Sequence, residues 1–160
     1  GMKWQENIKC IDKDIAVVYS ANLIDIHICL KSMMIEISEN YVELKCNYNK
    51  ETGDEIIFKG IVRGFEGYDI KGLYYESEIN MAKLELERIA KEAFEKYKIQ
   101  DVCIFHRVGF VKHGEIAMVV KVISKHRKEG FEAIIYIVDE IKKRVPIWKK
   151  ELSERGERWI

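Results

Sequence analysis

The 160-residue chain is poor in proline, with Pro146 alone, and it contains no internal repeat, linker or low-complexity tract. No apolar run is long enough to span a bilayer, so we expect no transmembrane helix and no membrane partner. The N-terminus lacks the pattern of a signal peptide, which predicts a cytoplasmic protein. Hydrophobic residues make up 48% and charged residues 34% of the chain, a balance typical of one globular domain with a real core.

Cysteine is also scarce, and its spacing is not that of metal ligands or of a CxxC motif. The four cysteines are Cys10, Cys29, Cys46 and Cys103. We therefore expect reduced thiols without a sulfur-carrying role, no metal site and no cofactor. The sequence also lacks an evident Ser-His-Asp or Cys-His arrangement and a pair of carboxylates placed for acid–base catalysis. Cationic side chains remain as the candidates for chemistry.

Charge of neither sign dominates, since 27 basic residues balance 27 acidic ones. Residues 121–150 depart from this balance, with nine Lys or Arg and four Asp or Glu. A basic element on a neutral chain indicates one anionic site rather than a general nucleic-acid surface. We therefore expect an anionic ligand and no nucleic acid. The alternative is a non-catalytic α+β module that binds RNA or an anionic partner through this basic stretch.

The basic stretch is predicted to contain one long helix, a break at Pro146 and an extended tail. Apolar residues at helical spacing form one stripe, namely Phe131, Ile134, Ile135, Val138, Ile141 and Val145. Lys142 falls inside this stripe, so it either reaches solvent at the helix C-terminus or has a depressed pKa. His126 and Arg127 come at the helix start, where free backbone N–H groups favour an anion. A solvated basic turn is the alternative for this pair.

Periodicity and turn residues predict the remaining strands. They are expected over residues 8–18, 33–37, 55–63, 69–77, 101–108 and 115–123, with the stretch from 20 to 37 otherwise ambiguous between helix and strand. The strands 55–63 and 69–77 are predicted to pair as a hairpin around the loop 64–67. The strand 101–108 is apolar on both faces, which places it centrally in a sheet.

Two further helices are predicted, one over 39–48 with Ser38 as its cap and one over 81–97 with Asn80 as its cap. Strands and helices mix without strict alternation, which favours the α+β class. His106 and Arg107 end the strand 101–108. There they either brace a turn or bind a ligand.

Short motifs occur in a fixed order along the chain. They are Phe58-Lys59-Gly60-Ile61-Val62-Arg63, Leu73-Tyr74-Tyr75-Glu76 with Met81-Ala82, His106-Arg107-Val108-Gly109, His126-Arg127, Phe131-Glu132-Ala133, Lys142, Pro146-Ile147-Trp148-Lys149-Lys150-Glu151, and Gly156-Glu157-Arg158-Trp159. In order and spacing this set resembles the large, catalytic subunits of molybdopterin synthase, the MoaE family. Each motif is short, but the ordered set is specific and runs from about residue 38 to residue 160.

The resemblance implies a fold and an activity. The fold is an α+β domain of the α/β-hammerhead type over residues 38–160, with antiparallel or mixed sheets and packed helices. Residues 1–37, an N-terminal extension with the first strand, have little counterpart in the family. The implied activity is sulfur transfer from the C-terminal Gly-Gly thiocarboxylate of a small ubiquitin-like carrier subunit to cyclic pyranopterin monophosphate. Its product is the dithiolene of molybdopterin.

The same resemblance implies roles for individual residues. Lys142 and Lys149 fall on the catalytic lysines of the family. The substrate-binding positions are Arg63, His126 and Arg127, together with Ile61, Val62, Lys150 and Glu151. Whether either lysine forms a covalent intermediate stays open.

A distance along the predicted helix indicates a homodimer. His126 and Lys142 lie at opposite ends of that helix, roughly 24 Å apart at about 1.5 Å per residue. One pterin monophosphate is too short to contact both. Two copies related by a two-fold axis would bring His126 and Arg127 of one chain towards Lys142 and Lys149 of the other. The resemblance implies the same central dimer, flanked by two carrier subunits in a heterotetramer.

Overall fold

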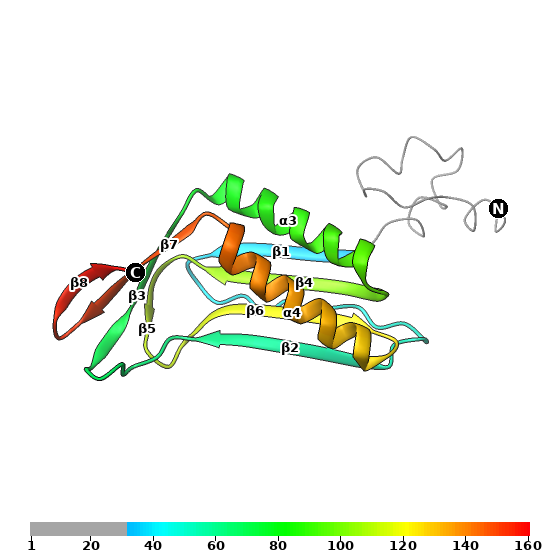
Figure 1. The fold of residues 1–160 in the computed structure, drawn as a ribbon, viewed down its shortest axis with the longest axis horizontal. Helices are drawn as coiled ribbons and strands as arrows, with labels where there is room; N and C mark the ends of the chain where they lie inside the picture. Colours follow the sequence, from blue (N-terminus) through cyan, green and yellow to red (C-terminus); the bar gives the residue numbers. More distant parts are fainter. Residues whose placement is uncertain (1–31) are drawn as a thin grey trace. The chain divides into compact units, whose positions relative to one another are not determined.

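The computed structural model describes residues 32–160 of the chain (Figure 1). By its internal contacts the chain divides into Gly1–Ser32 and Met33–Ile160, and the description that follows concerns the second unit. The strand expected over 8–18 and the ambiguous stretch from 20 to 31 lie outside the described residues. Within the described part, no helix combines the length and the apolar character needed to cross a membrane.

Two helices and two four-stranded sheets make up the described part. The elements in chain order are β1 (Ser32–Ser38), β2 (Asp54–Ile61), β3 (Ile70–Ser77), α3 (Ile79–Lys96), β4 (Ile99–Arg107), β5 (Gly109–Lys112), β6 (Ile116–Ser124), α4 (Arg127–Arg144), β7 (Ile147–Ser153) and β8 (Gly156–Trp159). The first sheet has the strand order β1-β4-β6-β2, and the second has the order β5-β3-β7-β8. This architecture confirms the predicted α+β class and the central position of β4.

Helices α3 and α4 cover one face of the first sheet, and the main hydrophobic core lies between helices and strands (Figure 1). Alternate residues of the strands, such as Val102 and Ile104 of β4, point into this core. Helix α4 lies very close to the sheet. A Cβ atom at Gly130 would stand 2.7 Å from the Ile56 side chain and 2.7 Å from Ser124 Oγ. Glycine at this position therefore permits the close approach.

The other face of the first sheet is covered by residues 41–47, which form no helix. The Tyr41 ring packs edge-on against Phe105 of β4, with 5.4 Å between ring centroids. The buried Lys121 of β6 donates a hydrogen bond of 2.6 Å to the carbonyl oxygen of Leu44. Strands β4 and β6 are therefore buried on both faces. This accounts for the continuous apolar run that marks β4 in the sequence.

The prediction of a helix over 39–48 is wrong for a reason that is visible in the sequence. Val42, Leu44 and Cys46 are half-buried, whereas the residues between them are exposed. This period of two is that of an extended chain lying on a surface. Ser38 does not cap a helix but is the last residue of strand β1. The alternation over 42–46 was therefore a better guide than the possible cap.

The second sheet joins segments that are distant in the sequence. Strand β3 pairs antiparallel with both β5 and β7, and β7 pairs antiparallel with β8. The predicted hairpin between 55–63 and 69–77 is wrong, because β2 pairs with β6 in the first sheet while β3 belongs to the second. Gly109 has a φ of 80° between β4 and β5, where the chain passes from one sheet to the other. That left-handed conformation favours glycine.

Both helices differ in detail from the prediction. Helix α3 begins at Ile79, and its N-cap is Glu78 rather than Asn80, since the Glu78 carboxylate accepts a 2.7 Å hydrogen bond from Met81 N. Helix α4 buries a face that is rotated from the predicted stripe and is formed by Gly130, Ala133, Ile134, Ile137 and Ile141. Phe131 and Ile135, expected in the core, are 50% and 62% exposed.

Candidate functional site

A cleft of about 680 Å³ lies where the end of α4 meets the ends of β2 and β4 and the strands β3 and β7. Of the nine residues to which the resemblance gives a role, six line it: Ile61, Val62, Arg63, Lys142, Lys149 and Glu151. The two sheets meet at this cleft, so its walls come from strands and a helix terminus of one rigid framework. The structure therefore brings together most of the residues implied by the resemblance.

The two lysines reach the cleft from different elements. Lys142 lies in the last turn of α4, and Pro146 separates that helix from β7, which carries Lys149. Side chains alternate along β7, so Ile147, Lys149 and Glu151 all face the cleft. The Lys142 side chain is exposed in the single chain, because the core face of α4 is rotated away from it. It reaches solvent, one of the two alternatives left open by the sequence.

The floor of the cleft holds a buried carboxylate. Glu151 accepts a 2.5 Å hydrogen bond from the hydroxyl of Tyr68, and Arg158 of β8 lies 3.6 Å from the same carboxylate. Tyr68 and Arg158 also line the cleft, and no role was predicted for either residue. Arg158 belongs to the Gly156–Trp159 motif, which was the available signal. Tyr68 lies in the connection between β2 and β3, where no pattern marks it.

Lys150 occupies the opposite face of β7 and does not line the cleft. Its ammonium lies 3.2 Å from the carboxylate of Glu157 and 5.3 Å from the centre of the Trp159 ring. Arg63 stands at the rim, where its side chain is 79% exposed and pairs with Glu66. The position of Lys150 follows from the strand period, because neighbouring residues of a strand point to opposite faces.

His106 at the end of β4 also lines the cleft. Its Nδ1 lies 2.6 Å from the carbonyl oxygen of Arg107, and because a carbonyl only accepts, Nδ1 carries the proton and Nε2 remains an acceptor. Burial lowers the pKa of His106, which keeps the ring neutral near pH 7. Tyr75 of β3 packs edge-on against the ring, with 5.1 Å between centroids. His106 therefore joins the two sheets and offers an acceptor to the cleft.

His126 and Arg127 lie at the other end of α4 and do not line the cleft. His126 is the N-cap residue of the helix, although its side chain makes no capping hydrogen bond. Fifteen helical residues separate Arg127 from Lys142, a distance of roughly 22 Å. Within one chain the implied substrate-binding residues other than Lys150 are therefore divided between the cleft and the start of α4.

The nine Lys and Arg residues of the basic stretch 121–150 differ in whether they pair with a carboxylate. Lys121, Lys125, Lys143, Arg144 and Lys150 each pair with a carboxylate. Among the described residues, no carboxylate pairs with the other four, which are Arg127, Lys128, Lys142 and Lys149. Two of them lie at the start of α4 and two line the cleft. Unpaired cations at these positions favour an anionic ligand.

A family model described as MoaE protein matches residues 30–144 of the chain. The molybdopterin synthase catalytic subunit of Pyrococcus abyssi is 46% identical over 113 residues, covering 70% of this chain and 76% of that protein. The protein of the same name from Thermoplasma volcanium is 41% identical over 107 residues, covering 66% and 78%. The human catalytic subunit is 36% identical over 104 residues, covering 64% of this chain and 55% of its own length.

Solved structures agree with these relatives. The crystal structure of molybdopterin synthase from Staphylococcus aureus aligns with a TM-score of 0.69 and 33% identity, over 81% of this chain and 96% of that one. A complex of subunits 1 and 2 of molybdopterin-converting factor from Helicobacter pylori aligns with a TM-score of 0.61 at 20% identity, which is a likeness of fold, over 79% and 88% of the two chains. Because the family model matches most of its length, the chain belongs to the MoaE protein family.

Proposed function

We propose that this chain is the catalytic subunit of a molybdopterin synthase and that its cleft is the site of sulfur transfer. The reaction moves sulfur from the C-terminal thiocarboxylate of a small ubiquitin-like carrier to cyclic pyranopterin monophosphate, which yields the dithiolene of molybdopterin. One observation supports the assignment above all others: Lys142 and Lys149 line one cleft, and neither pairs with a carboxylate of the described residues. Two unneutralised ammonium groups suit a phosphate and a thiocarboxylate.

The proposed roles follow from position. Lys149 lies on the same side of β7 as the buried Glu151, so it is held above the floor of the cleft, where it stabilises charge that develops on the thiocarboxylate carbonyl as sulfur leaves. Lys142 approaches from the helix end and acts as nucleophile or base once its ammonium group has lost a proton. Arg63 at the rim supplies a guanidinium to the phosphate. His106 presents a neutral acceptor to the N–H groups of the pterin.

The carrier is proposed to place its C-terminal tail in this cleft. The Helicobacter pylori structure is a complex of two subunits of the converting factor, and its fold resembles that of this chain. The last two residues of a tail that ends in Gly-Gly have no side chains, which lets them lie against the walls formed by β3 and β7. The cleft has a volume of about 680 Å³, enough for an extended tail together with a pterin.

A homodimer is proposed to complete the site. Arg127 and His126 stand roughly 22–24 Å from Lys142 along α4, too far for one pterin to contact both groups. A two-fold axis would bring the start of one α4 close to the cleft of the other chain. The exposed apolar residues Phe131 and Ile135 of α4 give this helix a face that a second chain could cover. The assembly would then be a dimer of catalytic subunits with two carriers.

Turnover of the reconstituted system tests the proposal. The purified chain is mixed with a thiocarboxylated carrier and cyclic pyranopterin monophosphate, and the dithiolene product is quantified. We expect product with the unaltered chain and a loss of roughly 10²–10⁴-fold with Lys142→Ala. The matched control is Lys143→Ala. Lys143 is the neighbour of Lys142 in the sequence, and it is an exposed lysine that pairs with Glu140. Equal turnover of the two variants would refute the assigned role of Lys142.

A further inference from the structure

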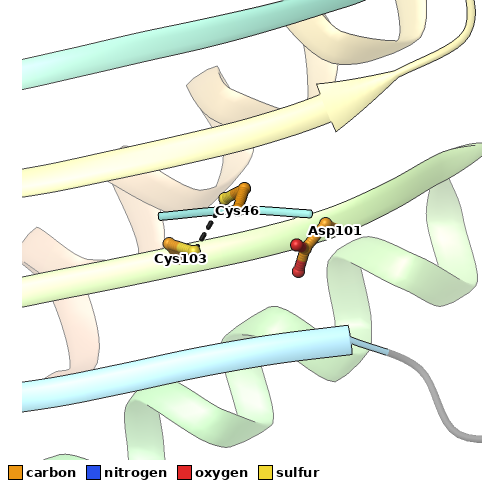
Figure 2. A group of neighbouring side chains, drawn as sticks. All are labelled: Cys46, Asp101 and Cys103. Carbon is orange, nitrogen blue, oxygen red and sulfur yellow. Dashed lines mark hydrogen bonds between the residues drawn. The ribbon is translucent and has the colours of Figure 1, made fainter. Parts of the chain in front are cut away.

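Two sulfur atoms lie in contact at a distance from the cleft. Cys46 of the segment 41–47 and Cys103 of β4 place their Sγ atoms 2.7 Å apart (Figure 2). Figure 2 shows the Cys46 segment running along β4 on the face of the sheet that is turned away from α3 and α4. Neither cysteine lines the cleft, and 57 residues separate them in sequence. The proposed sulfur-transfer chemistry uses neither thiol.

Asp101 lies beside the two thiols and completes a group of three residues with metal-ligating side chains. Its carboxylate is already committed to the backbone, since Oδ2 accepts a 2.8 Å hydrogen bond from Asn47 N and Oδ1 accepts a 2.8 Å hydrogen bond from Val102 N. Two thiolates on one tetrahedral zinc ion would also stand about 3.8 Å apart, because each Zn–S bond is about 2.3 Å long. The sulfur atoms are closer than that. Asp101 thus holds the covering segment in place, and the contact does not have the spacing of a metal site.

We propose that Cys46 and Cys103 form an intramolecular disulfide that fastens the segment 41–47 to β4. A disulfide bond is about 2.05 Å long, so the two sulfur atoms need to approach by well under 1 Å. The segment is already positioned for this by the Tyr41–Phe105 ring contact and by the bond from Lys121 to Leu44. Neither end of the bridge would have to leave its place in the fold.

The oxidant is a small-molecule disulfide such as oxidised glutathione. Cys46 is half-buried and Cys103 is 1% exposed, so the Cys46 thiolate attacks first and releases one small thiol. The Cys103 thiolate then attacks Cys46 Sγ and displaces the second small thiol. Two protein thiols lose two electrons and two protons in total, and the reagent disulfide is reduced to two thiols. The hydrogen bond to Cys103 and burial raise the pKa of Cys46, which makes the exchange faster at higher pH.

Such a bridge would act on stability rather than on turnover. It closes a loop of 57 residues between the covering segment and the central strand, which restricts the unfolded chain. His106, which lines the cleft, and Cys103 point to opposite faces of β4, and neither cysteine lines the cleft, so we expect turnover to be unchanged by the bridge. We expect the melting temperature to rise by roughly 10 °C on oxidation.

The test uses the full chain with Cys10→Ser and Cys29→Ser, which leaves Cys46 and Cys103 as its only thiols. Samples are equilibrated in glutathione buffers of increasing oxidised fraction, blocked with an alkylating reagent in denaturant, and mapped by mass spectrometry without reduction. We expect a cross-linked peptide pair containing Cys46 and Cys103, and a melting temperature that rises with the cross-linked fraction and falls again on reduction. Cys46→Ser in the same background is the control and should show neither effect.

Three outcomes would overturn the proposal. The first is alkylation of both thiols in the most oxidising buffer. The second is a cross-link that leaves the melting temperature unchanged, since the bridge would then not fasten the segment. The third is protection of both thiols that a chelator reverses, because that result would identify a bound metal ion instead. Since none of these measurements involves turnover, they are independent of the proposed sulfur transfer.

Discussion

Arg144, in the last turn of α4, donates a 2.6 Å hydrogen bond to Glu92 of α3, and its guanidinium also reaches Glu85 at 2.6 Å. This contact joins the two helices beside Lys142. Hydrogen bonds from Arg144 and Tyr136 lower the pKa of Glu92 from 4.5 to about 2. Ionised Glu92 therefore stabilises the folded chain at pH values above 4.5, and this contribution is lost as the pH falls towards 2.

We expect Glu92→Gln to lower the free energy of unfolding by about 1 kcal/mol near neutral pH. The difference from the unaltered chain should shrink as the pH falls below 4.5, because protonated Glu92 and glutamine are then alike. Urea unfolding at a series of pH values measures it. Glu95→Gln removes an exposed carboxylate from the same helix and serves as the control. A Glu92→Gln difference that is the same at every pH would contradict the ion pair as its cause.

Lys149 and Lys150 are neighbours on β7 that face opposite sides of the strand. We expect Lys149→Ala to reduce turnover by roughly 10²–10³-fold, because a charge at the thiocarboxylate is lost. Lys150→Ala should cause a loss at least about tenfold smaller, since it removes a contact to Glu157 and the Trp159 ring outside the cleft. Steady-state assays of the two variants make the comparison. Equal losses would show that the strand face does not decide function.

The tail of the carrier supplies a third prediction. If the Gly-Gly terminus reaches Lys149 within the cleft, a carrier whose last two residues are alanines should bind this chain but transfer sulfur poorly. Each added methyl group would meet the walls formed by β3 and β7. Binding and single-turnover sulfur transfer are measured separately with the same carrier. Transfer at the normal rate from the alanine carrier would exclude a narrow channel.

The shared site predicts complementation between two inactive chains. Arg127→Ala and Lys142→Ala alter opposite ends of α4, so a dimer of the two variants would contain one intact site if each site takes residues from both chains. We expect the mixture to recover part of the lost turnover after subunit exchange. Mass spectrometry under native conditions verifies that mixed dimers form. Mixed dimers without recovered activity would place all these residues in a single-chain site.

The sequence predicted the elements whose pattern is local. The two helices, the central strand β4 and the extended stretch after Pro146 all follow from periodicity and from a proline break. Lys142 and Lys149 were singled out through the ordered motifs, and both line the cleft, whereas their catalytic role stays a prediction. The predictions of secondary structure succeeded because each rests on one segment of the chain.

Apart from the helix predicted over 39–48 and the cap predicted at Asn80, which are local errors, the errors concern relationships between segments. Strands β2 and β3 are neighbours in sequence, yet they belong to different sheets, and no local pattern reports that choice. Phe131 and Ile135 were predicted to lie in the core because they are apolar and at helical spacing, yet both are exposed. The spacing of apolar residues does not distinguish a helix face that meets the core from one that a second chain could cover. Tyr68 was missed because a tyrosine in an irregular connection has no periodicity, although its hydroxyl contacts Glu151 in the folded chain.

The most direct test of the account is to follow the sulfur atom itself. A carrier thiocarboxylated with isotopically labelled sulfur is mixed with the chain and cyclic pyranopterin monophosphate, and the product is analysed by mass spectrometry. The account predicts that both dithiolene sulfurs carry the label with the unaltered chain and with Lys143→Ala, and that labelled product is lost with Lys142→Ala. Absence of labelled product with the unaltered chain, under conditions in which another molybdopterin synthase forms it, would contradict the account.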